Sequence, residues 1–363
     1  MNQRSDLNYS NHLILAQLAL EQYGLSTIKT LYDEEGSADA VLKKLGKTFP
    51  EEEARAQEEM AWCEQNNVRI LTISDADYPD RLRHCNDAPM VLFARGKADL
   101  NAPHIISIVG TRKSTLYGHD CINKIVKDLT CLCPDIVIVS GLAYGIDICA
   151  HRAALSNGLS TVGVVAHGQD TLYPSVHRND ANKMCLGNGG VVTEFFHGTR
   201  SLAPYFLQRN RIIAGMSDAV IVAESAVHGG GLYTARLAQD YHREVFAIPG
   251  PIHSPASEGT NNLIRDNKAT LITSAHDIIN LLQWQSAADI NRARQQGIER
   301  QMFLDLTPDE QKVINCLQQS GDMQANLIAM HTAIPIGPLN ALLFSLEMKG
   351  AIKQLSGNTY HLV

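Results

Sequence analysis

The segment that decides the fold reads IISIVGTRK at residues 105–113 and IVIVSGLAYGID at residues 136–147. In both stretches a run of mostly β-branched apolar residues ends near a glycine, Gly110 in the first and Gly141 in the second. Short continuous apolar runs are typical of strands buried on both faces. Glycine lets the chain turn tightly where such a strand ends. Each stretch therefore predicts a buried strand that turns into a helix.

The same alternation of short apolar runs with helical stretches continues to Leu282. The runs comprise residues 105–109, 136–139, 161–165, 191–193, 219–223 and 245–248. This pattern predicts an α/β domain with a parallel sheet covered by helices on both faces. In such sheets ligands bind beyond the carboxyl ends of the strands, where glycine turns lead into helix N-termini.

The two ends of the chain have a different pattern. Residues 1–67 predict a small helical module, and the short strand-like runs at 68–73 and 90–93 lead into a core that extends to residue 282. Residues 283–304 are polar and suit a linker. Residues 305–363 predict helices followed by a terminal hairpin, which suggests a winged helix; its first helix opens with the capping-box sequence TPDE at 307–310.

The composition narrows the class of protein. A chain of 363 residues predicts two or three domains. Without an apolar leader or a run of about 18 apolar residues, we expect a cytoplasmic protein that does not enter a membrane. The eight cysteines form no C-x-x-C pair, so we expect free thiols and no metal site. The net charge is -7, but the acidic excess lies in residues 1–99, so a nucleic-acid site in the balanced core is not excluded.

The turn after the first run delivers an arginine to the edge of the predicted sheet. Gly110 and Thr111 precede Arg112, an arrangement that suits a phosphate group. The turn matches neither the G-x-G-x-x-G dinucleotide fingerprint nor the Walker loop. A solvent-exposed arginine on an ordinary strand-to-helix turn is the alternative.

The turn after the second run holds two glycines, Gly141 and Gly145, whose amides can face an anion. Asp147 and His151 lie four residues apart on the following helix, but two side chains are too few for a metal site. We therefore favour a role for Asp147 in capping backbone groups and orienting the loop.

A pair of arginines, Arg209 and Arg211, stands at a predicted helix just before the run at 219–223. Paired guanidinium groups suit bidentate phosphate contacts. An interior ion pair with Asp218 or Glu224 explains the same spacing equally well. The spacing alone leaves both interpretations open.

Taken in order, these motifs resemble the family called DNA-processing protein A, also named Smf. The matching segments are Tyr78-Pro79 and residues 108–112, 117–118, 140–147, 150–151, 172–174, 209–215, 245–250 and 259–264. The resemblance is closest over residues 68–282 and weaker at both ends. It implies an extended Rossmann-like core that binds single-stranded DNA without base specificity, helps to load a RecA-type recombinase during natural transformation, and forms a homodimer.

The resemblance also implies roles for particular residues. Arg178 replaces a family lysine at a phosphate, and His177 is placed where its ring could stack on a base. The residues expected to hold phosphates are Gly110, Thr111, Arg112, Ser140, Gly141, Arg178, Arg209, Asn210 and Arg211. The N-terminal helices resemble SAM or helix-hairpin-helix modules. The C-terminal unit resembles a winged helix with few basic residues, which favours protein contact or dimer stabilisation over DNA reading.

Two other functions compete with DNA binding. Related Rossmann-like enzymes hydrolyse the N-glycosidic bond of nucleoside monophosphates with a positioned glutamate, for which Glu194 or Glu224 would have to substitute here. The other is a recombination scaffold that binds partners through its outer domains. We expect a binding protein with no catalytic residues and no cofactor, and therefore not an enzyme.

Overall fold

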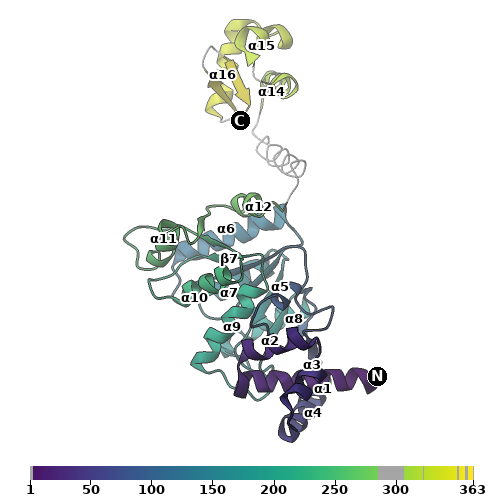
Figure 1. Cartoon of the computed structure of the whole chain (residues 1–363). Coiled ribbons are helices and arrows are strands. Elements are labelled where there is room, and N and C mark those ends of the chain that lie inside the picture. The colour runs from purple at the N-terminus through teal and green to yellow at the C-terminus, as the bar shows by residue number, and fades with distance from the viewer. Residues whose placement is uncertain (1–2, 285–305, 322, 350, 356–358, 363) are drawn as a thin grey trace. The chain divides into compact units, whose positions relative to one another are not determined.

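The computed structural model describes residues 3–284, 306–321, 323–349, 351–355 and 359–362 (Figure 1). The chain forms two compact units, Met1–Trp284 and Gln285–Val363. Most of the linker expected at 283–304 lies outside the described residues. The domain boundaries expected from the sequence therefore stay predictions.

The larger unit is built on one nine-stranded sheet, in the order β1-β2-β6-β5-β4-β3-β7-β8-β9. The strands are β1 (Arg69–Thr72), β2 (Val91–Gly96), β3 (Ile105–Val109), β4 (Val137–Ser140), β5 (Ser160–Val164), β6 (Gly190–Thr193), β7 (Ala219–Val222), β8 (Glu244–Ala247) and β9 (Thr270–Leu271). From β6 to β9 all neighbouring strands are parallel, which confirms the predicted α/β sheet. β1 and β2 extend this sheet as antiparallel strands, and β9 was not predicted.

Helices bury both faces of the sheet, because successive side chains of a strand point to opposite sides. In β3, Ile106 and Ile108 belong to one apolar cluster, whereas Ile105 and Val109 belong to the other. The core helices are α5 (Asp80–Arg83), α6 (Leu116–Leu132), α7 (Ile146–Ser156), α8 (Arg178–Leu186), α9 (Ala203–Gly215), α10 (Gly230–Asp240), α11 (Glu258–Arg265) and α12 (Ala275–Leu282). α6, α7 and α12 cover the Ile106 face, and α9 and α10 contribute to the opposite cluster.

The predicted N-terminal helical module is present and packs on the Val109 face of the sheet. It comprises α1 (Gln3–Leu18), the π-helical turn Ala19–Tyr23, α2 (Leu25–Glu35), α3 (Ala38–Leu45) and α4 (Pro50–Gln65). Leu13, Leu18 and Ala56 are fully buried in the same apolar cluster as β2 and β7 residues. This module and the sheet therefore share one hydrophobic core.

The second unit is a winged helix, as predicted. It contains α14 (Pro308–Ser320), β10 (Met323–Gln324), α15 (Ala325–Thr332), α16 (Ile336–Met348), β11 (Ile352–Leu355) and β12 (Thr359–Leu362). The capping box forms between Thr307 and Glu310, and Glu310 also accepts hydrogen bonds from Lys349 at 2.8 Å. Ile336, Phe344 and Met348 are exposed on α16. A DNA-reading helix presents polar and basic side chains to the DNA. Here Lys349 is bonded to Glu310, and the exposed surface of α16 includes large apolar side chains.

Within the described ranges, no single helix is long and apolar enough to cross a membrane. α15 and α16 satisfy the length and composition criteria only as a pair, and the two helices are bent by 109° at their connection. Leu339 and Leu343 of α16 are fully buried in the apolar core of the winged helix.

Candidate nucleic-acid interface

The glycine turns meet at one edge of the sheet because β3, β4 and β5 run parallel and end there. The turn after β3 touches the turn after β4: the amide of Ile146 donates to the carbonyl of Thr111 at 3.2 Å. Gly145 has φ +78°, and a Cβ added to it would lie 2.2 Å from that carbonyl oxygen. Only glycine fits this position, so the two turns form one closely packed surface.

Arg112 is exposed on this surface and lies over an aromatic ring. Its guanidinium carbon is 5.0 Å from the centroid of the Phe206 ring, in the first turns of α9. Tyr173, from the connection after β5, meets Phe206 edge-on with ring centroids 5.7 Å apart. A cation–π contact at an exposed site stabilises by about 0.5–1 kcal/mol, enough to orient the guanidinium without burying it.

Exposed apolar side chains gather around the same edge. They lie in the connections that follow β3, β4, β5 and β6, or in the first two turns of the next helices: Leu116, Tyr144, Tyr173, Val176, Leu202 and Leu207. Grouped apolar exposure of this kind marks an interaction surface, whereas single exposed apolar residues do not. The edge therefore combines an exposed cation with aromatic and aliphatic surface.

Arg209 and Arg211, expected to contact phosphate, are instead buried, at 3% and 4% exposure. Arg209 donates to the carbonyls of Gly141, at 2.6 Å, and Val164. Arg211 pairs with Glu194. From Arg209 onward α9 enters the core, and only Asn210 remains half-buried. The phosphate role expected for both arginines is wrong in this structure, and the interior ion pair is formed with Glu194.

The two acidic residues proposed as interior partners have other roles. Asp218 pairs with Arg81 at 2.6 Å. Glu224 accepts hydrogen bonds from the backbone amide of Thr115 at 2.8 Å and from its hydroxyl at 2.5 Å. Because Thr115 is the N-cap of α6, the Glu224 carboxylate stabilises the start of that helix.

Ser140 and Gly141 shape the turn from inside. The Ser140 hydroxyl is buried and donates to the carbonyl of Ile108 at 2.6 Å. A Cβ added to Gly141 would lie 2.3 Å from Nη1 of Arg209. Gly141 is therefore required so that Arg209 can reach the turn. Contact of the Gly110, Thr111 or Gly141 amides with a phosphate stays a prediction.

Asp147 and His151 do not form a catalytic or metal pair with each other. Burial raises the pKa of Asp147, while the nearby charge of Arg209 opposes that shift. His151 is fully buried beside the hydroxyl of Thr161, 2.7 Å from Nδ1, and burial lowers its pKa to about 3. In the part of the chain that the structure describes, no group of His, Cys, Asp and Glu side chains is arranged to hold a metal ion.

His177 and Arg178 differ sharply in exposure. The His177 ring is 3% exposed, its Nδ1 lies 2.8 Å from the carbonyl of Leu142, and Tyr144 packs edge-on at 5.2 Å. Base stacking on His177 is therefore a wrong prediction, because the ring has no open face. Arg178 is exposed at the start of α8, as expected for a phosphate ligand.

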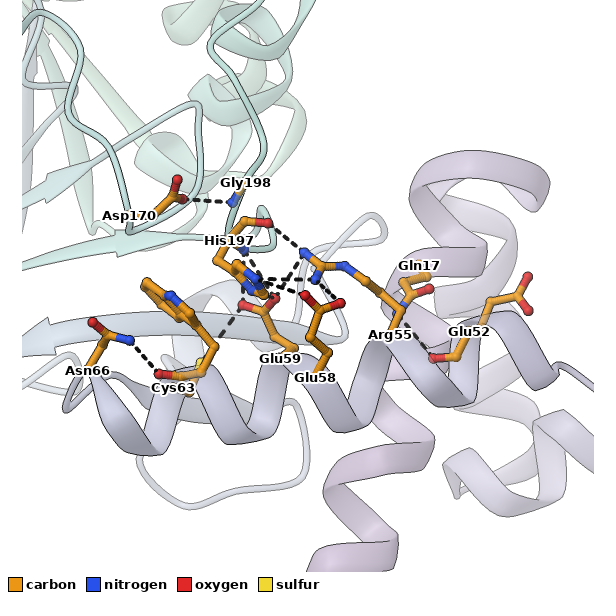
Figure 2. A network of polar contacts seen from close by, with 11 residues as sticks. Gln17, Glu52, Arg55, Glu58, Glu59, Cys63, Asn66, Asp170, His197 and Gly198 are labelled. Atoms are coloured by element: carbon orange, nitrogen blue, oxygen red, sulfur yellow. Dashed lines mark hydrogen bonds and ion pairs between the residues drawn. The ribbon is translucent and has the colours of Figure 1, made fainter.

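The N-terminal module anchors the loop that leads from β6 to α9 (Figure 2). The buried Glu59 carboxylate accepts from the His197 amide at 3.1 Å and contacts its Nδ1 at 2.6 Å. Trp62 stacks on the His197 ring with centroids 4.9 Å apart. The amide of Gly198 donates to Asp170 at 2.8 Å, which joins the loop to the connection after β5. No sequence pattern predicts this contact, because Glu59 lies in a helix rich in exposed glutamates.

Replacing Glu59 by alanine is expected to loosen this loop, because it removes the acceptor for two His197 groups. Hydrogen exchange of peptides covering residues 195–199 should accelerate, and the protein should lose about 1–3 kcal/mol of stability. Glu64→Ala is the matched control, since Glu64 is exposed on the same helix and, within the described ranges, forms no hydrogen bond or ion pair with the loop. Unchanged exchange in the loop of Glu59→Ala would show that the contact does not hold it.

This architecture defines the class of protein: a Rossmann-like α/β protein with an arginine- and aromatic-rich sheet edge and a winged helix. The chain belongs to the DNA recombination-mediator protein A family, whose model matches residues 69–283. The model of the DprA winged helix domain matches residues 304–358. The family resemblance seen in the sequence motifs is thus confirmed.

Named relatives agree with this assignment. Protein Smf of Escherichia coli (strain K12) is 34% identical over 311 residues, which cover 82% of this chain and 78% of the relative. DNA processing protein DprA of Streptococcus pneumoniae (strain ATCC BAA-255 / R6) is 39% identical over 210 residues, covering 58% and 72%.

Two solved structures have the same fold. The X-ray structure of DNA processing protein A from Streptococcus pneumoniae is 32% identical, with a TM-score of 0.58, and the match covers 77% of this chain and 96% of the other. DNA processing protein A from Helicobacter pylori, whose structure concerns a single-stranded DNA binding mode, is 28% identical, with a TM-score of 0.53 and coverage of 60% and 95%.

Proposed function

We propose that this chain binds single-stranded DNA at the carboxyl edge of its sheet and acts as a mediator of DNA recombination and transformation. The observation that carries the proposal is the exposed Arg112 guanidinium over Phe206, beside the tightly packed glycine turns. Arg112 and Arg178 bind phosphate groups, with the Gly110 and Thr111 amides beside them. Arg209 and Arg211 are buried beneath this surface and stabilise it through their contacts with Gly141 and Glu194.

The mixture of charge and aromatic surface favours a single strand over a duplex. Guanidinium groups bind the backbone phosphates, whereas the exposed Tyr144 and Tyr173 offer ring surface to bases. Only a single strand exposes the faces of its bases to such rings. Stacking does not read base identity, so the proposed binding has little sequence preference.

We propose further that the site breaks no bond. The rival enzyme needs a free carboxylate, but Glu224 caps the start of α6 and Glu194 is paired with Arg211 in the core. The chain acts as a homodimer in the cytoplasm and delivers the strand to a RecA-type recombinase, a role that membership of a recombination-mediator family supports. The exposed Ile336, Phe344 and Met348 support protein contact by the winged helix.

The test is the fluorescence anisotropy of labelled oligo-dT and of a matched duplex, over a range of salt concentrations. We expect binding that is tighter for the single strand and falls with salt at a log-log slope of roughly 0.7 per neutralised phosphate. Absence of oligo-dT binding at low salt would favour the alternative of a recombination scaffold that binds protein partners. Release of free base from nucleoside monophosphates would favour the enzyme.

A further inference from the structure

A groove of about 230 Å³ lies between α8 and β2, next to the proposed interface. It is lined by Arg95 of β2, by Arg178 and Asn182 of α8, and by Asp170 and Thr171 after β5. Arg178 and the β5 connection belong to the carboxyl edge of the sheet. The groove therefore continues the proposed DNA surface toward β2.

The side chains that line the groove have a net positive charge. Among the described residues, neither Arg95 nor Arg178 forms an ion pair with a carboxylate, and both are exposed. Asp180 is paired with Arg152 at 2.9 and 3.2 Å and does not offset this charge. Asp170 lines the groove and accepts from the neutral amide of Gly198 at 2.8 Å, so it offsets one of the two cations and leaves the other in excess. Two guanidinium groups that line one groove without forming an ion pair, against a single carboxylate, leave a net positive charge that can hold an anion.

The size of the groove favours one chemical class of anion. Typical small-molecule pockets measure about 300–1,000 Å³, so the groove is small for a whole ligand. A water molecule takes about 30 Å³ of liquid, so the groove has room for a phosphate and part of its sugar. Because the groove is open to solvent and begins at the proposed interface, a strand held at Arg112 and Arg178 can continue into it.

We propose that this groove binds a further phosphate group of the single strand and that Arg95 is its ligand. The inference rests on the proposed function and extends it to a residue that no sequence motif marked. It predicts that the strand runs from Arg112 past Arg178 to Arg95, so Arg95 contributes only to strands long enough to reach it.

The experiment compares Arg95→Ala with wild type on a nested series of labelled oligo-dT strands, beginning with the shortest that binds. On long strands Arg95→Ala should bind about fivefold more weakly at low salt, and its log-log salt slope should be lower by roughly 0.7. On the shortest strand it should bind as wild type does. Arg95→Lys, which keeps the charge, should retain the slope.

Lys97→Ala is the matched control, because Lys97 is an exposed cation two residues away that does not line the groove. If wild type binds oligo-dT but Arg95→Ala equals Lys97→Ala at every length, the inference is wrong and the proposed function stands. A loss that is equal at all lengths, or that leaves the slope unchanged, also overturns it. If wild type binds no oligo-dT, the proposed function fails as well.

Discussion

Replacing Arg112 by alanine is expected to weaken oligo-dT binding by more than about tenfold at low salt, while the protein stays folded. The guanidinium is exposed, and its contact with Phe206 contributes only about 0.5–1 kcal/mol, so folding loses little. Binding loses a charge-assisted phosphate contact at the centre of the proposed surface. Fluorescence anisotropy measures the affinity, and thermal unfolding measures the stability.

Two further variants make this prediction specific. Arg112→Lys keeps the charge but not the planar fork of donors, so it should bind with intermediate affinity and a salt slope close to that of wild type. Lys113→Ala removes an exposed charge from the next residue and should have a small effect. An Arg112→Ala protein that binds as tightly as wild type, with the same slope, would remove this residue from the DNA surface.

The strands were the most predictable part of the fold. The run at Ile105–Val109 matches β3, because a strand buried on both faces is apolar at nearly every position, here at all but Ser107. The winged helix was predictable from its capping box at Thr307 and its terminal hairpin, since these signals are local. The two-residue β9 was not predictable, because Thr270 and Leu271 form no run.

The candidate site was only partly predictable, because burial is set by distant parts of the chain. Arg112 and Arg178, expected at phosphates, are both exposed, while their contact with phosphate stays a prediction. The sequence could not tell that α9 begins at Ala203 and enters the core at Arg209, since charged side chains are mostly exposed. The contact between Glu59 and His197 joins residues 138 positions apart and leaves no local pattern.

Replacing Arg211 by methionine is expected to destabilise the core by about 3–5 kcal/mol, because it leaves the buried Glu194 without its cation. Burial already raises the pKa of Glu194, and the charge of Arg211 opposes that shift. Without Arg211 the folded-state pKa of Glu194 rises further above its unfolded value. The folded variant then holds a proton that the unfolded chain releases, so its stability falls as pH rises from about 4.5 toward neutrality.

Urea unfolding followed by tryptophan fluorescence, at several pH values between about 5 and 8, checks this dependence. Adding Glu194→Gln to Arg211→Met removes the unpaired charge, so the double variant should recover stability and lose the pH dependence. DNA binding separates the two roles considered for Arg211. A buried ion pair predicts that any loss of affinity follows the loss of folded protein and leaves the salt slope unchanged. A stable Arg211→Met protein with a slope lower by roughly 0.7 would instead make Arg211 a phosphate ligand and contradict the buried pair.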